Sequence, residues 1–405
     1  MSIAAEPQTA VDGLTQAKRF RAAGKPQQAL EAIEVFLQGE PEHLEGLCVR
    51  SLSKCDLGRV DEAVDELYDA MFIDGEDPGV LGALADCMRA RAEPDTAICY
   101  YDQALDGSPD DAALKWRRAL CLLTDNQIQQ GMAALADGWV QMFTERGGVL
   151  ADMPSWTGGP VEDKRVLIHP DPYIGNTLQF LRFVRDLKAA GATACMAPSP
   201  DLELLVADLG VEFSTQADLQ VSLMAIPGLL GLSESDLGSE PYLRAEVKGL
   251  ISGEGRHIGI SWRGSPEEPA DTFKAPPLSE FGPIAGLEGI SLWRMQPQGD
   301  PEELEAAGFA PKAPPVDLRA KEAPLAAIAS MVQELDAVVT ADTELAHLAG
   351  ALGVRALLVL PASCSWRWMY WREDSPWYPS VTLVRQNVAG EWSPVFKKVA
   401  ELLQS

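Results

Sequence analysis

The stretch Gly58-Arg-Val-Asp-Glu-Ala63-Val-Asp-Glu-Leu67 contains the pattern that decides the fold of the first third of the chain. Its alanine recurs every 34 residues, at Ala29, Ala63 and Ala97, and Gly131 continues the series. A large apolar residue follows each of these positions four places later (Ile33, Leu67, Tyr101, Leu135), and a small one precedes each by twelve (Ala17, Ser51, Ala85, Ala119). A fixed period of this length predicts stacked pairs of antiparallel helices.

The residues between the predicted helices fit the same interpretation. Glycine stands five positions before the alanine at Gly24 and Gly58, and is replaced by Ala92 and Asn126 in the later units. Small residues let two helices approach closely, and glycine suits the turn that joins them. The pattern resembles the tetratricopeptide repeat, with three good units and a weaker fourth across residues 12–145. Such arrays form a concave groove that binds a peptide or protein, although the array could instead brace its neighbour or mediate self-association.

The remainder of the chain alternates between short apolar runs and helical patterns. After a turn-rich linker at residues 145–160, the apolar runs predict parallel strands joined by crossover helices (strands 165–169, 193–197, 257–262, 290–293, 337–340 and 356–360; helices 177–190 and 343–352). The pattern restarts near Arg256, which predicts two Rossmann-like halves, residues 154–255 and 256–405. The fold class expected is therefore α + α/β, with ligands at the carboxyl ends of the strands.

Composition limits the function further. The chain is globular in character, with 46% hydrophobic and 23% charged residues, and its formal net charge is −27. So negative a surface disfavours nucleic acids and anionic membranes. The seven cysteines are scattered and contain no C-x-x-C pair, which argues against a disulfide framework or a zinc site. No secretory signal or membrane span is recognisable, so we expect a cytoplasmic protein without membrane insertion.

Several segments of the second part resemble glycosyltransferase family 9, the heptosyltransferase-like enzymes of GT-B fold. They are Pro154-x-Trp-x-Gly158, Ile174-Gly-Asn-Thr-Leu-Gln-Phe180, Ser261-Trp-Arg-Gly264, residues 341–353, and Trp366-Arg-Trp with residues 372–379. Bacterial proteins that join tetratricopeptide repeats to such a domain are known. The resemblance implies a nucleotide-sugar donor as substrate, inversion at the sugar carbon, and no metal or other cofactor.

The strongest candidate donor site is the run Asp342 to Gly353. A strand ends at Asp342, and a helix that starts near Thr343 would point its free N–H groups toward an anion. Thr343 and His347 are four residues apart and share one helix face. In the family this corner holds the donor's diphosphate. The structural alternative for His347 is an ordinary core histidine.

Further donor contacts are expected after the strand that contains Trp262. The family has two arginines near the following helix, whereas this chain offers Lys274, which can act only as a point charge on phosphate. Arg263 is a possible substitute, and both bases could equally be solvated surface residues. Trp366 and Arg367 belong to a tryptophan-rich segment that could shape the nucleotide pocket or only pack in the core.

The first loop departs from the family pattern. Asn176 stands where the family has the aspartate expected to be the general base, and a carboxamide cannot take a proton from an acceptor hydroxyl. Asp171 and His169 are candidate substitutes. Tyr173 replaces a glycine that leaves room for a ligand, and Gly175 belongs to the same pocket-shaping loop.

These observations leave three hypotheses for the function. The first is a sugar transferase that acts on a protein recruited by the repeat groove, where the groove raises the acceptor's effective concentration. The second is an adaptor that keeps the fold without transferring sugar. The third, an enzyme acting on a glycan or lipid-linked sugar, is least favoured because no basic membrane-binding patch is present.

Overall fold

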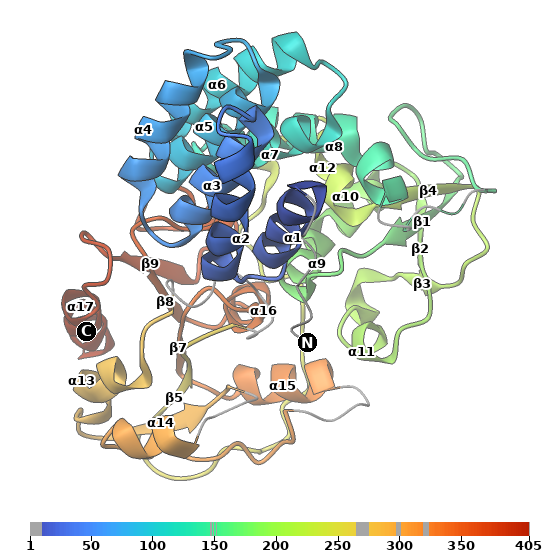
Figure 1. Ribbon diagram of the computed structural model, residues 1–405. Coiled ribbons are helices and arrows are strands. Elements are labelled where there is room, and N and C mark those ends of the chain that lie inside the picture. Colours follow the sequence, from blue (N-terminus) through green and yellow to red (C-terminus); the bar gives the residue numbers. More distant parts are fainter. Residues whose placement is uncertain are drawn as a thin grey trace, which may run out of the picture. The chain divides into compact units, whose positions relative to one another are not determined.

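The computed structural model describes residues 10–145, 148, 150, 152–264, 275–296, 301–318 and 324–404. It divides into two compact units, the first of which contains the chain up to Asp125 and the second Asn126–Gly264 and Phe273–Ser405. The first unit is helical and the second is α/β (Figure 1). The predicted fold class is confirmed: a tetratricopeptide-type array precedes a GT-B-type module of two Rossmann-like halves.

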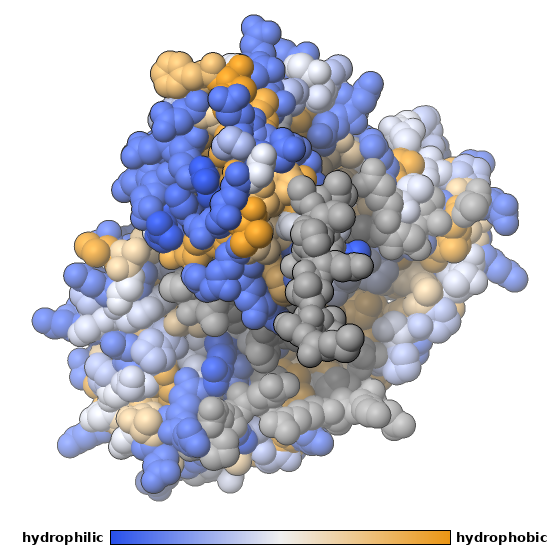
Figure 2. All heavy atoms as spheres, in the orientation of Figure 1, coloured by the Kyte–Doolittle hydropathy of each residue, from blue (hydrophilic) through white to orange (hydrophobic). Residues whose placement is uncertain are grey.

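The described part of the first unit contains three antiparallel helix pairs and one further helix, α7, that packs on α6. The helices are α1 (Ala10–Ala22), α2 (Pro26–Gly39), α3 (Leu44–Asp56), α4 (Val60–Met71), α5 (Pro78–Ala90), α6 (Pro94–Gly107) and α7 (Ala112–Thr124). The positions that carry the sequence period are in the core. The small residues Ala17, Ser51, Ala85 and Ala119 are fully buried, as are Ala29, Ala63 and Ala97. Their size permits the close helix contact that the period predicts. The face of the molecule shown in Figure 2 is mainly hydrophilic.

The ends of the helices repeat as regularly as their cores. The residue two positions before α2, α4, α6 and α8 (Ile128–Glu145) is left-handed, with φ of 67° at Gly24, 78° at Gly58, 63° at Ala92 and 63° at Asn126. The N-caps of α3, α5 and α7 also stand 34 residues apart, and each accepts a backbone N–H bond (His43, Asp77, Asp111). An N-cap of this kind satisfies one of the unpaired donors at a helix start.

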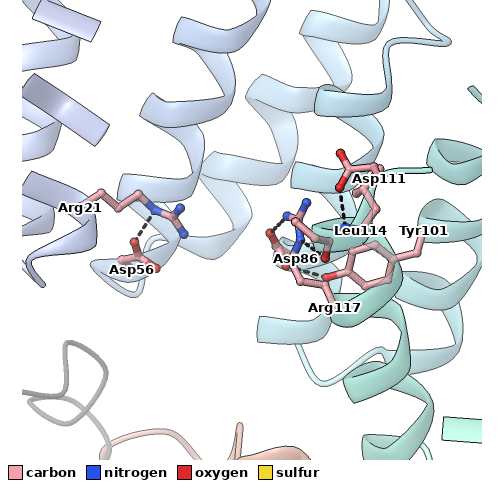
Figure 3. Close-up of polar contacts among 8 residues, drawn as sticks. Arg21, Asp56, Asp86, Tyr101, Asp111, Leu114 and Arg117 are labelled. Atoms are coloured by element: carbon pink, nitrogen blue, oxygen red, sulfur yellow. Dashed lines mark hydrogen bonds and ion pairs between the residues drawn. The ribbon is translucent and has the colours of Figure 1, made fainter. Parts of the chain in front are cut away.

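Side-chain hydrogen bonds also connect helices of neighbouring repeats in the array (Figure 3). Asp86 of α5 accepts hydrogen bonds from the Tyr101 hydroxyl and from Arg117 Nη1 of α7, both at 2.6 Å. Arg21 Nε of α1 donates to Asp56 of α3 at 2.7 Å. These bonds fix the spacing of successive repeats, because charge-assisted hydrogen bonds are stronger than neutral ones.

The first half of the α/β unit is a parallel sheet in the order β3-β2-β1-β4. Its strands are β1 (Arg165–His169), β2 (Thr193–Met196), β3 (Glu212–Phe213) and β4 (Leu219–Ser222). The helix expected at 177–190 is instead three pieces: α9 (Ile174–Phe180), the 3-10 turn η1 (Leu181–Phe183) and α10 (Val184–Ala189). Shorter helices follow, namely α11 (Pro200–Glu203), η2 (Ala207–Leu209), η3 (Leu223–Ala225), α12 (Ile226–Leu229) and η4 (Glu234–Asp236).

The second half is a parallel sheet in the order β6-β5-β7-β8-β9. Its strands are β5 (Arg256–Ser261), β6 (Ile290–Arg294), β7 (Ala337–Thr340), β8 (Ala356–Leu360) and β9 (Val381–Arg385). The helices are η6 (Leu278–Phe281), α13 (Gly282–Ala285), α14 (Pro301–Ala306), α15 (Pro324–Gln333), α16 (Glu344–Leu352), η7 (Trp366–Trp368) and α17 (Ser393–Gln404). Phe281 and Phe396 meet at 4.5 Å between ring centroids and anchor α17 to the core of this half.

Helix α8 (Ile128–Glu145) belongs to the α/β unit by its contacts, although its sequence continues the 34-residue pattern. It packs on α12, where a side chain at Gly228 would collide with the Met132 carbonyl oxygen. Trp139 is buried and donates its indole N–H to the Trp156 carbonyl at 3.1 Å. Among the described helices, including α8, none is both long enough and apolar enough to cross a membrane.

Candidate functional site

The loop after β1 is ordered by Asp171. This carboxylate is 6% exposed, and its Oδ1 accepts hydrogen bonds from the Tyr173 backbone N–H at 2.9 Å and from Asn176 Nδ2 at 3.0 Å. The Asp171 carbonyl oxygen accepts from the Thr177 hydroxyl at 3.0 Å. Asp171 therefore holds the start of α9 in place and fixes the orientation of the Asn176 amide.

Asn176 makes one of the contacts between the two halves of the α/β unit. Its Oδ1 accepts hydrogen bonds from Nε of Arg367, at 2.8 Å, and from Nη2 of the same guanidinium. Arg367 Nη1 donates to the Ser365 hydroxyl at 2.7 Å, and the guanidinium lies 4.9 Å from the centroid of the Trp366 ring. All of these partners are neutral. Within the described part of the chain, no carboxylate forms an ion pair with Arg367.

His347 lies in α16 and is 2% exposed. Its Nδ1 is hydrogen-bonded to the Tyr378 hydroxyl at 3.0 Å, and its ring stacks on Trp368 with centroids 5.0 Å apart. Burial, and then the positive charge of Arg367, hold the pKa of His347 well below its usual 6.5. The imidazole is therefore neutral at physiological pH.

Gly175 allows the loop after β1 to touch this histidine. A Cβ atom at Gly175 would lie 2.8 Å from Cδ2 of His347, closer than a side chain tolerates. The helices α9 and α16 pack directly against each other around this point. The predicted catalytic loop and the predicted donor histidine, which are far apart in sequence, thus meet in one place.

Thr343 caps α16, as its position at the end of β7 predicts. Its Oγ1 accepts from the Leu345 backbone N–H at 3.3 Å and is hydrogen-bonded to the Thr340 hydroxyl at 2.9 Å. Asp342 is half-buried beside it at the carboxyl end of β7. The first turn of a helix leaves backbone N–H donors without partners inside the helix, and the Thr343 cap satisfies one of them.

Arg263, Trp262 and His169 take no part in the contacts described above. Arg263 is already paired with Glu303 of α14, and Trp262 before it is 1% exposed. His169 Nε2 is hydrogen-bonded to Gln220 Oε1 at 2.9 Å, and burial lowers its pKa although this hydrogen bond opposes the shift. Lys274 lies outside the described residues. Trp366 is buried and packs on Phe180 at 6.1 Å between ring centroids.

The contacts among α9, α16 and residues 366–378 form what we call the junction. Three residues for which the sequence predicted no role also lie there, namely Arg182, Tyr242 and Tyr378. The Tyr242 hydroxyl donates to the Leu178 carbonyl at 2.7 Å, and the Arg182 guanidinium lies 4.7 Å from the Tyr242 ring and 5.5 Å from the Tyr378 ring. Tyr378 belongs to residues 372–379, which carry the family resemblance, so the sequence did mark its segment as a candidate. No pattern in the sequence singled out Tyr242 or Arg182, because neither belongs to a segment that resembles the family.

No site for a metal is evident where the structure describes the chain: in those residues no three His, Cys, Asp or Glu side chains gather as metal ligands would. The positive charges at the junction come from Arg182 and Arg367. An arginine suits phosphate recognition because its planar fork can bind two oxygens at once.

Comparison with known proteins gives distant matches. No protein-family model matches the chain. Protein FlbA of Caulobacter vibrioides is 23% identical over 372 residues, which cover 80% of this chain and 58% of that protein. The chain therefore spans less than two thirds of that relative's length.

The matches among solved structures are also distant. An O-GlcNAc transferase of Thermobaculum terrenum aligns with 98% of this chain and 92% of its own, at 13% identity and a TM-score of 0.36. A tetratricopeptide protein of Thermus thermophilus aligns with 33% of this chain and 83% of its own, at 18% identity and a TM-score of 0.28. These scores are low, so the architecture rests on the helix pairing and strand order described above. The chain joins a tetratricopeptide-type helical array to an α/β module that contains two parallel sheets.

Proposed function

We propose that the chain binds a nucleotide sugar at the junction around Arg367 and transfers the sugar, with inversion, to a protein recruited by the helical array. The observation that carries the proposal is the half-buried guanidinium of Arg367, whose hydrogen-bond partners are all neutral. A buried charge is costly without a counterion. A diphosphate is the counterion that this setting favours, because the capped start of α16 supplies further donors.

The Asn176 carbonyl indicates where a phosphate oxygen would bind. It already occupies the fork of the guanidinium through two hydrogen bonds. A negatively charged oxygen in the same position forms stronger, charge-assisted bonds. His347, held neutral, contributes a polar contact rather than a second positive charge. Arg263 and Lys274 are additional candidate phosphate contacts that this proposal does not require.

The proton of the acceptor hydroxyl needs a base, and Asp171 is the best candidate. The hydrogen bonds from Tyr173 and Asn176 both end on its Oδ1, so Oδ2 remains for a proton. Asn176 cannot serve, because an amide does not accept a proton at neutral pH. His169 is a weaker candidate, since it is tied to Gln220 and its pKa is lowered. A nucleotide-sugar substrate also favours a cytoplasmic location.

A second function is favoured by a different observation. The loop that carries the family's catalytic position contacts His347 directly through Gly175, and the catalytic aspartate is replaced by Asn176. An adaptor that kept the fold for binding, without transfer, would have no need for that carboxylate. The two functions differ in whether a bound nucleotide sugar is turned over.

Calorimetric titration with nucleoside diphosphates and nucleotide sugars tests the proposal. We expect the wild-type chain to bind one nucleotide saturably and Arg367→Gln to bind it about 10- to 100-fold more weakly, the equivalent of a lost hydrogen-bonded charge. Arg355→Gln is the matched control, because Arg355 is exposed and donates to the Leu402 carbonyl. Equal binding by wild type and Arg367→Gln would contradict the proposed site.

A transfer assay then separates the two functions. Sugar released from the donor onto protein, and lost in Asp171→Asn, supports the transferase. Nucleotide binding without any turnover, unchanged in Asp171→Asn, supports the adaptor. Absence of binding to every nucleotide in the panel would overturn nucleotide-sugar recognition altogether.

A further inference from the structure

Trp371 stands apart from the other tryptophans of the chain. Its side chain is 84% exposed, whereas Trp368 and Trp377 in the same segment are 1% and 0% exposed. Tryptophan carries the largest apolar surface of any side chain, so full exposure costs the folded chain free energy. Trp371 is four residues from Arg367, yet it takes no part in the contacts of the junction.

The backbone that presents Trp371 is strained. Trp371 has φ of 65° and Met369 has φ of 46°, both in the left-handed region that bulky residues avoid. Strain of this kind persists only where the surroundings fix the chain, and it is concentrated at functional sites. Two unfavourable residues within three positions therefore require an explanation.

Flanking contacts hold the strained segment on both sides. Arg385 Nη2 donates to the carbonyls of Trp368 and Met369 at 3.1 and 2.6 Å. Arg372 donates to Asn126 at 2.8 Å and forms ion pairs with Glu234 and Asp374 at 2.9 and 2.8 Å. The exposed indole is thus presented by a rigid support, which lowers the entropy lost when it binds a partner.

Negative charges lie close to Trp371 along the chain and at its neighbour Arg372. Asp374 and Glu234, the two carboxylates that share Arg372, are 72% and 46% exposed in their side chains, and Glu373 is exposed between Arg372 and Asp374. One arginine stands against three carboxylates. An exposed aromatic face attracts a cation through the ring quadrupole, and carboxylates nearby in the chain add a Coulomb attraction.

We propose that Trp371, with Glu234, Glu373 and Asp374, forms a docking platform for a lysine- or arginine-bearing segment of a partner polypeptide. The net charge of −27 supports a basic partner, because like charges would repel an acidic one. The platform deepens the proposed function, in that it names the chemistry of the protein acceptor. Its test uses no nucleotide, so it can fail or succeed independently of sugar transfer.

The test uses two labelled peptides, Lys-Gly-Ser repeated four times and its Glu-Gly-Ser counterpart, with fluorescence anisotropy of the full chain at 0.15 M salt. We expect the lysine peptide alone to bind, and Trp371→Leu, which keeps apolar area without the ring, to weaken it about threefold. Phe72→Ala, a change at an aromatic side chain 88% exposed in the array, should leave binding unchanged. Equal binding of both peptides, or equal binding by wild type and Trp371→Leu, would overturn the platform.

A second variant distinguishes docking from folding. Trp371→Gly removes the strain, so its midpoint of thermal unfolding should rise while the lysine peptide binds more weakly. A fall in the unfolding midpoint of Trp371→Gly would mean that the indole stabilises the fold, and it would contradict the proposal that the exposed indole serves to bind a partner.

Discussion

Gly350 offers a direct test of how tightly the junction is packed. It lies in α16, one turn from His347, with Tyr378 against it: a Cβ atom there would be 2.5 Å from Cδ1 and 2.9 Å from Cβ of that tyrosine. Those atoms are near the backbone of a ring that is fully buried, so the tyrosine cannot swing aside. Overpacking of this kind costs about 1–3 kcal/mol.

The matched control is Gly138 of α8, another helical glycine of the α/β unit. No heavy atom lies within 4 Å of a Cβ built at this position. Gly138→Ala should therefore stabilise the chain by about 0.5–1 kcal/mol, since alanine is the better helix former. The same substitution is thus expected to have opposite signs at two sites of one unit.

Thermal unfolding followed by circular dichroism measures both variants. At about 2–4 °C per kcal/mol, Gly350→Ala should lower the midpoint by roughly 2–12 °C, and Gly138→Ala should raise it by a few degrees. The hydrogen bond from Tyr378 to His347 should be disturbed as well, so nucleotide binding should weaken in Gly350→Ala. A Gly350→Ala midpoint at or above that of wild type would refute the close approach of α16 to Tyr378.

Two further predictions concern the array and the buried histidine. Ala92→Gly should raise the guanidinium unfolding midpoint by the equivalent of about 0.5–1 kcal/mol, because alanine is strained at φ 63° where the earlier repeats use glycine. The control Ala90→Gly, in the last turn of α5, should lower the midpoint. The pKa of His347 is depressed in the folded chain, so the unfolded chain takes up a proton on this residue first as the pH falls. The contribution of His347 to stability is therefore complete above pH 6.5 and is lost below it, by up to about 1.4 kcal/mol per pH unit. Unfolding midpoints between pH 7.5 and 5 should therefore fall less steeply in His347→Gln than in wild type, and parallel curves would argue against a buried neutral imidazole.

Local chemistry made much of this architecture predictable. The 34-residue period identified the buried alanines and the left-handed turns, because both follow from helix pairs that repeat along the chain. The strands at Arg165, Arg256 and Ala356 were predicted as continuous apolar runs, since parallel strands are buried on both faces. Strands β3, β4 and β9 were not predicted, because β3 has only two residues and Gln220 and Thr382 break the apolar runs of β4 and β9.

The arrangement of the site was predictable only in part. Thr343 and His347 were found from their spacing at the start of one helix. The pairing of Asn176 with Arg367 joins residues 191 positions apart, and no local pattern encodes such a contact. Likewise, the single helix expected at 177–190 divides into three pieces, a break that no proline or glycine in that stretch marks.

The hydrogen bonds between Asn176 and Arg367 also bear on how a ligand affinity should be interpreted. A phosphate that uses this guanidinium must first displace the carboxamide, so the chain binds only from the fraction of molecules in which that contact is open. The measured dissociation constant is the intrinsic one divided by this fraction, and each 1.4 kcal/mol by which the closed form is favoured weakens apparent binding about tenfold. A modest affinity would therefore reflect competition from the chain's own amide as much as the quality of the site, and the substitution Asn176→Ala would reveal the difference.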